Sequence, residues 1–141
     1  MKRILLVGKT GSGKTSLAQA LQGFEISYRK TQAVSYSSFI IDTPGEFLEN
    51  RRYYSALLAS STGCDLVGLV QDGTLQNSLF PPNFASMFSK KVIGIVSKTE
   101  HIHCNTSRAE KFLRWAGAKE IILTSAITRR GIEDLQKYLH P

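Results

Sequence analysis

Five short apolar runs alternate along the chain with longer stretches of helical pattern. The apolar runs are rich in β-branched residues and nearly continuous, which is typical of strands buried on both faces of a sheet; they cover Ile4 to Val7, Phe39 to Ile41, Leu66 to Val70, Val92 to Val96 and Ile121 to Leu123. Helical patterns lie between and after them, at Lys14 to Leu21, Leu48 to Ser60, Ser107 to Ala116 and Gly131 to Leu139. This alternation predicts an α/β fold in three layers, with a mostly parallel sheet of about five strands. A ligand is expected beyond the carboxyl ends of the strands.

One irregular tract interrupts the alternation. Asp72-Gly73 and Pro81-Pro82 mark turns and loop between residues 71 and 83, and a short helix is expected around Phe84 to Phe88. In the helix that follows the fourth strand, Trp115 falls on the apolar face with Phe112 and is expected in the core.

Length and composition fit one soluble domain. A chain of 141 residues, 42% apolar and 21% charged, is long enough for one core and short for two. The apolar run after Met1 is only four residues long, so neither a membrane span nor a secretion signal is expected, and no membrane partner. The two cysteines, Cys64 and Cys104, are too few for a disulfide framework and favour a cytoplasmic protein.

The net charge of +7 suggests an anionic ligand or partner. Basic residues scattered over solvated faces would give the same number. The chain has no long basic cluster interleaved with aromatic residues, so a phosphate ligand is favoured over nucleic acid, and no nucleic-acid partner is expected.

A complete phosphate-binding motif, GxxxxGK[ST], follows the first strand and opens the first helix. Its glycines let backbone N–H groups close around phosphates, Lys14 reaches the β and γ phosphates and takes part in catalysis, and Thr15 can ligate Mg²⁺. A glycine-rich turn of purely structural role is the alternative. The residues expected to bind the nucleotide here are Gly8, Lys9, Thr10, Gly11, Ser12, Gly13, Lys14, Thr15 and Ser16.

A second motif, DxxG, follows the strand that ends near Asp42. An aspartate at this position holds Mg²⁺, usually through water, and the backbone N–H of Gly45 can sense the γ-phosphate. A surface turn built from Asp and Pro-Gly would look similar by itself.

Two further segments end at the carboxyl edge where a base could lie. Ser97-Lys98-Thr99-Glu100 follows the fourth strand and Thr124-Ser125-Ala126 follows the fifth. The residues expected to face the base are Ser97, Lys98, Glu100, Ser125 and Ala126.

The ordered series GKTGSGKT, DTPG, SKTE and TSA resembles the Ras-like P-loop GTPases and spans nearly the whole chain. The stretch from Ile41 to Arg51, IDTPGEFLENR, and the segment from Tyr54 to Ala59 resemble more specifically the EutP/PduV family of ethanolamine and propanediol utilisation proteins. That resemblance implies one nucleotide-binding domain over residues 1–141, with Mg²⁺ and GTP or ATP as cofactors. It also implies a place beside a bacterial microcompartment, and an acetate kinase activity is attributed to the ethanolamine member.

The first switch loop departs from the Ras-like pattern. Thr31 is the candidate for the threonine that closes on Mg²⁺ and the γ-phosphate, although a plain loop threonine is an equal alternative. The spacing from Thr31 to Asp42 is too short for the usual antiparallel hairpin, so the second strand of the Ras-like sheet is expected to be short or absent.

Glu46 stands where many hydrolysing relatives place the glutamine that orients water. A carboxylate there would face the charge of the γ-phosphate and act as a weak base, so slow hydrolysis is expected. Alternatively, Glu46 is an acidic residue favoured by the dipole at the start of a helix. Lys9, Arg51 or Arg52 could supply a cation to the γ-phosphate, or the arginines could be solvated.

His101, His103 and Cys104 invite a metal interpretation, but three ligands without a second cluster do not make a tetrahedral site, and a polar loop is favoured.

Three functions fit these motifs. The first is a nucleotide switch that hydrolyses a nucleoside triphosphate slowly. The second is phosphoryl transfer to acetate, and the third is a nucleotide-bound scaffold that docks on a microcompartment shell protein through exposed apolar residues between Leu75 and Phe88. Because Glu100 carries its carboxylate one methylene further out than an aspartate, weak guanine preference is expected, with ATP use open.

Overall fold

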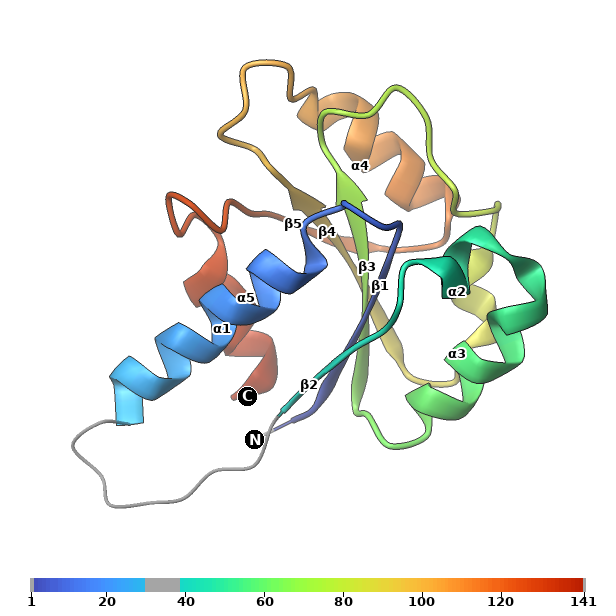
Figure 1. The fold of residues 1–141 in the computed structure, drawn as a ribbon, viewed down its shortest axis with the longest axis horizontal. Coiled ribbons are helices and arrows are strands. Elements are labelled where there is room, and N and C mark those ends of the chain that lie inside the picture. The colour runs from blue at the N-terminus through green and yellow to red at the C-terminus, as the bar shows by residue number, and fades with distance from the viewer. Residues whose placement is uncertain (1, 30–38, 141) are drawn as a thin grey trace.

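The computed structural model describes residues 2–29 and 39–140, and of residues 24–29 the backbone alone. Figure 1 shows strands and helices in alternation. The strands are β1 (Ile4–Gly8), β2 (Ile40–Asp42), β3 (Leu66–Asp72), β4 (Lys91–Ser97) and β5 (Glu120–Leu123). The helices are α1 (Lys14–Arg29), α2 (Glu46–Glu49), α3 (Tyr54–Ser61), α4 (Thr106–Trp115) and α5 (Ile132–Leu139), with 3-10 turns η1 (Arg51–Tyr53) and η2 (Phe84–Met87).

The sheet has five strands in the order β2-β1-β3-β4-β5, and every pairing among them is parallel. The α/β fold predicted from the alternation of apolar runs and helices is thereby confirmed. The strand expected to be short or absent, between Thr31 and β2, falls outside the described residues. In a parallel sheet the carboxyl ends of the strands meet at one edge, where the motifs that follow β1, β2, β4 and β5 come together.

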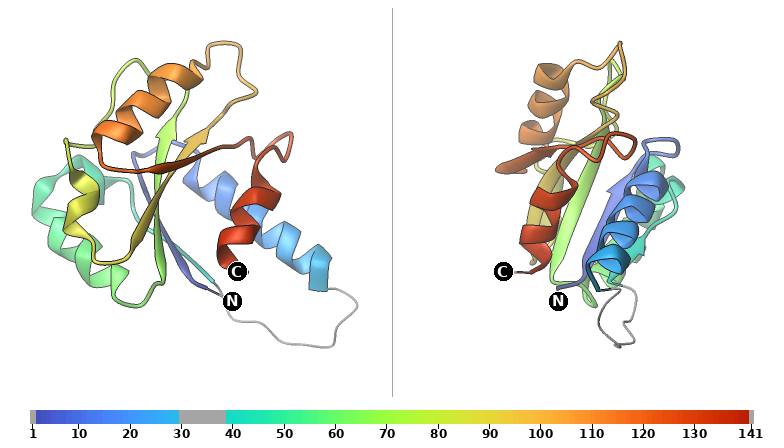
Figure 2. Two further views of the ribbon diagram at one scale, coloured as in Figure 1. Left: turned by 180° about the vertical axis from the view of Figure 1, so that it is seen from behind. Right: turned by 90° about the vertical axis from the view of Figure 1, so that its left-hand side faces the viewer.

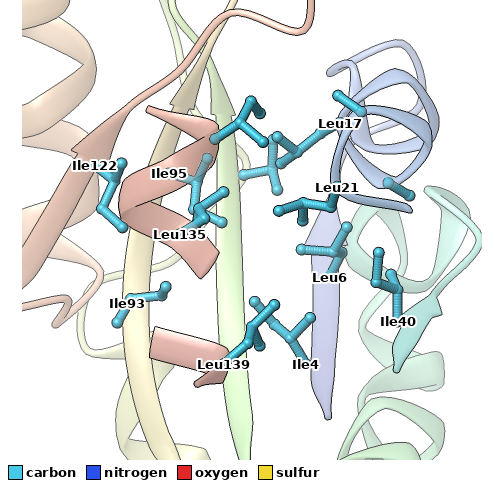
Figure 3. Close-up of a cluster of buried hydrophobic side chains, with 14 of the residues drawn as sticks. Ile4, Leu6, Leu17, Leu21, Ile40, Ile93, Ile95, Ile122, Leu135 and Leu139 are labelled. Carbon is cyan, nitrogen blue, oxygen red and sulfur yellow. The ribbon is translucent and has the colours of Figure 1, made fainter. Parts of the chain in front are cut away.

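The helices cover both faces of the sheet. On one face Leu17 and Leu21 of α1 and Leu135 and Leu139 of α5 pack on side chains of the central strands, as Figure 3 shows. Their partners in the sheet include Ile4, Leu6, Ile93, Ile95 and Ile122. These core positions fit the periodicity of the sequence, because alternate residues of a strand point to opposite faces.

The other face is covered by α2, α3, η2 and α4. Here the expectation of exposed apolar residues between Leu75 and Phe88 is largely wrong: Phe80, Phe84 and Phe88 are buried, and among the large hydrophobic side chains of this tract only Leu79 is strongly exposed, at 41%. The ring of Phe84 contacts the rings of Phe80, Phe88 and Tyr54 at centroid distances of 5.3–5.7 Å. The loop therefore lays an aromatic cluster into the core instead of presenting it to solvent.

Trp115 is not in the core as predicted, but 62% exposed. The buried residues of α4 and its C-cap are Ala109, Leu113 and Ala116, which have the spacing of one helical face. Trp115 lies about 100° around the helix from Ala116. It therefore points outward and contacts Phe112 at the edge of that face.

The helix predicted from Leu48 to Ser60 is broken. Asn50 is extended, with φ −135° and ψ 118°, and separates α2 from η1 and α3. Its side-chain oxygen accepts a hydrogen bond from the backbone N–H of Arg52 at 3.1 Å. An asparagine that caps the next turn in this way offers the backbone an alternative to a continuous helix.

Both ends of the described chain lie at the edge of the sheet opposite the phosphate motif, as both views in Figure 2 show. The backbone N–H of Lys2 donates to the carbonyl of Leu139 at 2.9 Å, which joins the start of β1 to the end of α5. Within the described ranges, none of the helices has the length and apolar character needed to cross a membrane.

Candidate functional site

The phosphate motif forms a tight loop between β1 and α1. Gly11 and Gly13 adopt left-handed φ angles of 80° and 94°, which favour glycine. Lys14 begins α1 and is only 7% exposed, and its Nζ donates to the carbonyl of Lys9 at 3.4 Å. Burial lowers the pKa of Lys14, while the carboxylates of Asp42 and Glu49 act in the opposite sense. The amino group is thus held inside the loop in which the motif would place phosphates.

Two oxygen-bearing side chains meet beside this loop. Thr15, the second residue of α1, donates from Oγ1 to Oδ2 of Asp42, the last residue of β2, at 3.1 Å. Both side chains are exposed. A hydroxyl and a carboxylate are hard ligands of the kind that Mg²⁺ prefers, so this pair fits the metal that the motifs imply. Thr31, the third residue predicted to contact the metal, lies outside the described residues.

The DxxG segment folds against the phosphate loop. Thr43 is buried and donates from Oγ1 to the carbonyl of Leu6 at 2.8 Å, which ties the segment to β1. Gly45 precedes α2, and a Cβ added there would lie 2.2 Å from Oγ1 and 2.3 Å from the backbone nitrogen of Thr10. Only glycine fits at this contact. Glu46 is the exposed first residue of α2, a position where the helix dipole favours an acidic side chain.

A contact that the sequence analysis missed joins α2 to the same loop. Oε2 of Glu49 accepts hydrogen bonds from Oγ1 of Thr10 at 2.7 Å and from its backbone N–H at 3.3 Å. These two hydrogen bonds are the main reason why the pKa of Glu49 is lowered, and the charges of Lys9 and Lys14 lower it further. An acidic residue one helical turn after the DxxG glycine was the only signal in the sequence.

Ser97 ties the base-facing edge to the phosphate loop. Its Oγ, at the end of β4, donates to the carbonyl of Ser12 at 2.5 Å. In Ras-like proteins this position usually holds an amide that makes a similar tie. The shorter hydroxyl therefore keeps the connection between the two loops, and the departure from the usual motif is smaller than the residue types suggest.

Lys98 also connects the base-facing segment to the phosphate loop. It has a left-handed φ of 62°, and its Nζ lies 2.7 Å from both the carbonyl of Gly11 and Oδ2 of Asp72. Asp72 was interpreted from the sequence only as part of a turn. Its position could have been inferred from the sheet, because it ends β3 directly beside Ser97 of β4.

Asp72 is 5% exposed and also accepts from the backbone N–H and Oγ1 of Thr74. Burial acts to raise the pKa of Asp72, but the hydrogen bonds from Lys98 and Thr74 and the charge of Lys98 together lower it. The carboxylate is therefore ionised at neutral pH and fixes the end of the Lys98 side chain.

Glu100 and Ser125, from the two predicted base-facing segments, are in direct contact. Oγ of Ser125 donates to Oε1 of Glu100 at 2.8 Å and accepts from the backbone N–H of Thr128 at 3.0 Å. Next to them is a cavity of about 190 Å³. Its lining residues are Gly13, Ser16, Leu17, Ser97, Lys98, Glu100, Thr124, Ala126 and Ile127. The structure thus brings the phosphate loop, SKTE and TSA around one cavity.

The two candidate arginines are both exposed, and Arg52 contacts Tyr53. Nη2 of Arg52 donates to the hydroxyl of Tyr53 at 2.9 Å, and its guanidinium lies 4.9 Å from the centroid of that ring. Arg51 is exposed. Of the three candidate cations, Lys9 alone belongs to the phosphate loop, and its carbonyl accepts from Lys14.

The HIHC segment has a local role in its loop. The backbone N–H of His103 donates to Nδ1 of His101 at 3.1 Å, and the two rings lie 5.4 Å apart. Among the residues that the structure describes, no three His, Cys, Asp or Glu side chains are grouped as a metal site would require.

Comparisons with known proteins agree with this arrangement. Among solved structures, the G domain of the T. maritima FeoB iron transporter has a TM-score of 0.62 and 25% sequence identity, covering 97% of this chain and 95% of that one. The cytosolic domain of the same transporter in its GMPPNP form has a TM-score of 0.61 at 24% identity, and this chain spans 62% of its length. The fold is therefore that of a Ras-like G domain, as the motifs predicted.

Proteins similar in sequence narrow the match from a fold to one family. The propanediol utilization protein PduV of Citrobacter freundii is 42% identical over 141 residues, 99% of this chain and 94% of that protein. The probable acetate kinase EutP of Escherichia coli strain K12 is 37% identical over 122 residues, 85% of this chain and 77% of that protein. The family model of ethanolamine utilisation and propanediol utilisation proteins matches residues 1–141. The chain belongs to this PduV-EutP family.

Proposed function

We propose that the chain is a single-domain nucleotide switch that binds a nucleoside triphosphate with Mg²⁺ and hydrolyses it slowly. The observation that carries the proposal is the buried amino group of Lys14, held in the phosphate loop with the Thr15–Asp42 pair and the cavity at Glu100 around it. Thr15 and Asp42 would hold the Mg²⁺, which neutralises charge on the phosphates when bound. The DxxG segment and the loop that includes Thr31 would respond to the γ-phosphate.

Slow hydrolysis follows from the residue after the DxxG glycine. A glutamine at this position can both donate to and accept from an attacking water, whereas the carboxylate of Glu46 only accepts and carries a charge like that of the γ-phosphate. Weak base selectivity follows from Glu100, whose longer side chain is held by Ser125. GTP and ATP are both substrates in this proposal, with GTP preferred slightly.

The family match supports a place for this switch beside a bacterial microcompartment that degrades propanediol or ethanolamine. A shell protein is then the partner that would distinguish the nucleotide states. Because the aromatic residues between Phe80 and Phe88 are buried, a docking surface has to be sought outside this tract.

A second candidate function is phosphoryl transfer to acetate, which is favoured by the relatives named as probable acetate kinases. An oxygen of acetate would attack the γ-phosphorus while the bond to the β–γ bridging oxygen breaks, which gives acetyl phosphate and the diphosphate. The acceptor is an anion, so a cation at the phosphate loop has to neutralise it, and Lys9, which belongs to that loop, would supply the charge.

One experiment separates the two functions. The protein is incubated with ATP or GTP and Mg²⁺, with and without acetate, and both inorganic phosphate and acetyl phosphate are measured. The switch predicts slow release of inorganic phosphate that acetate leaves unchanged; acetyl phosphate in proportion to acetate would support the kinase instead. Either product must disappear in Lys14→Ala and persist in Lys137→Ala, which removes an exposed lysine of α5, or it comes from a contaminant.

A further inference from the structure

Helix α2 and the glycine before it both contact Thr10 of the phosphate loop. The carboxylate of Glu49 accepts from both the hydroxyl and the backbone N–H of Thr10, at 2.7 Å and 3.3 Å. One turn earlier, Gly45 lies so close to Thr10 that no Cβ would fit between them. Two ends of one short helix thus contact one residue of the loop.

The position of this carboxylate matters because the phosphate loop is a site for anions. Lys9 and Lys14 are close enough to Glu49 to lower its pKa, after the hydrogen bonds from Thr10. The loop N–H groups and Lys14 are the groups that would hold the terminal phosphates. The negative charge of Glu49 therefore lies near the same lysines that would bind a γ-phosphate.

Helix α2 is also separate from the helix that follows it. Leu48 on its other side is 3% exposed and anchors it in the core, whereas the exposed Glu49 carboxylate makes the polar contact to the loop. The extended backbone at Asn50 separates α2 from η1 and α3. Release of Glu49 can therefore shift α2 without unwinding the following helix.

We propose that Glu49 is a specificity-determining residue, which makes the site favour a diphosphate over a triphosphate. Its carboxylate accepts hydrogen bonds from Thr10, and a bound γ-phosphate would displace it. This inference rests on the proposed nucleotide site. Two anions in one cationic field repel each other, so the triphosphate has to break the Glu49–Thr10 contact, whereas a diphosphate leaves it in place. The position of α2 then reports the presence of the γ-phosphate.

The test is the ratio of the dissociation constants for the diphosphate and for a non-hydrolysable triphosphate, measured with Mg²⁺ by titration calorimetry. Glu49→Gln keeps the shape of the side chain but removes its charge. We expect the triphosphate to gain about fivefold in affinity relative to the diphosphate, the size typical of an exposed charged contact. Glu133→Gln removes an equally exposed charge at the start of α5 and should leave the ratio unchanged.

A second variant tests whether the effect passes through Thr10. Thr10→Val removes the hydroxyl that donates to Glu49 and keeps the branched shape. If the two residues act as a pair, the ratio in the double variant changes by less than the product of the two single changes. A ratio that stays within about twofold of the wild type in Glu49→Gln, or strictly independent effects in the double variant, would overturn the inference.

The failure of this inference can be told from failure of the proposed function. If the wild-type protein binds neither nucleotide, both the proposed function and the role of Glu49 are wrong. If it binds both nucleotides and Glu49→Gln leaves the ratio of the dissociation constants unchanged, only the role of Glu49 is wrong. The contact itself is tested without nucleotide by the amide resonance of Thr10, which should move in Glu49→Gln and stay in place in Glu133→Gln; an unmoved resonance in both variants would also overturn the inference.

Discussion

Single polar side chains at the carboxyl edge of the sheet connect the phosphate loop to the base-facing loops. Ser97 binds the carbonyl of Ser12, and Lys98 binds the carbonyl of Gly11 while Asp72 holds its amino group. Because hydrogen bonds to charged groups are worth more than neutral ones, the Asp72–Lys98 pair is the strongest candidate for holding this edge in shape. The proposed base-binding and phosphate-binding loops are therefore held by the same side chains.

Replacement of Glu100 by aspartate should sharpen the preference for GTP over ATP. The carboxylate of Glu100 lies at the cavity in contact with Ser125, one methylene further from its backbone than an aspartate would place it. The shorter side chain restores the usual pairing with the ring N–H and the exocyclic amine of guanine. We expect the ratio of the ATP and GTP dissociation constants to rise about tenfold. A ratio that falls or stays level would show that Glu100 does not face the base.

Loss of the Asp72 charge should destabilise the protein in a pH-dependent way. Its pKa in the folded protein is below the ordinary value of 3.8, so its stabilising effect is present above that pH and is lost as the pH falls through the folded pKa. At pH 7, Asp72→Asn should lower the free energy of unfolding in urea by about 1–2 kcal/mol. The difference from wild type should narrow below pH 3.8.

The matched control for this measurement is Asp134→Asn, because Asp134 forms only a loose, exposed pair with Lys137 at 3.8 Å. It should change the stability by no more than about 0.5 kcal/mol. Equal losses in the two variants, or a loss in Asp72→Asn that does not depend on pH, would contradict the role given to the buried carboxylate.

Helices and turns of this fold are set in place by a few tight contacts at their ends. Gly45 brings α2 onto the phosphate loop, and Gly131 directly precedes α5 beside the last residue of β5. Asn50 divides what the sequence pattern indicates as one helix, because its side chain caps the next turn. The helix periodicity predicts where a helix packs, but it contains no signal for a break that depends on one side-chain hydrogen bond.

Gly131→Ala should be strongly destabilising. Gly131 has φ 75°, and a Cβ there would lie 2.1 Å from the carbonyl oxygen of Leu123. Backbone strain and displacement of α5 together should cost about 2–4 kcal/mol in the free energy of unfolding.

Gly23→Ala is the matching control, because Gly23 lies within α1 and a Cβ added there would lie 3.8 Å from Nη2 of Arg129, so the variant should gain about 0.5–1 kcal/mol in the free energy of unfolding. Similar unfolding midpoints for the two variants would contradict the packing described for α5.

Over the full chain, the apolar pattern was enough to predict five strands and their parallel arrangement in a layered α/β fold. It also predicted the edge of the sheet at which the motifs meet. The motifs likewise predicted the grouping of Lys14, Thr15 and Asp42. The hydrogen bonds from Thr10 to the exposed Glu49 could not be predicted, because no periodicity links residues 39 positions apart, whereas the pairing of β3 with β4 does place Asp72 near Lys98. The outward direction of Trp115 could not be predicted from its spacing to Phe112, because two residues three positions apart on a helix need not both lie on its buried face.

The proposed nucleotide site at this edge of the sheet is tested most directly by nucleotide binding. Titration calorimetry with GTP, GDP, ATP and ADP in the presence of Mg²⁺ should show binding to the wild-type chain, with a modest preference for guanine. Lys14→Ala should weaken binding by about a hundredfold or more, because it removes the amino group of a buried lysine that would bind the phosphates. Lys137→Ala should bind as the wild type does. Absence of binding to all four nucleotides by the folded wild-type protein would contradict the account.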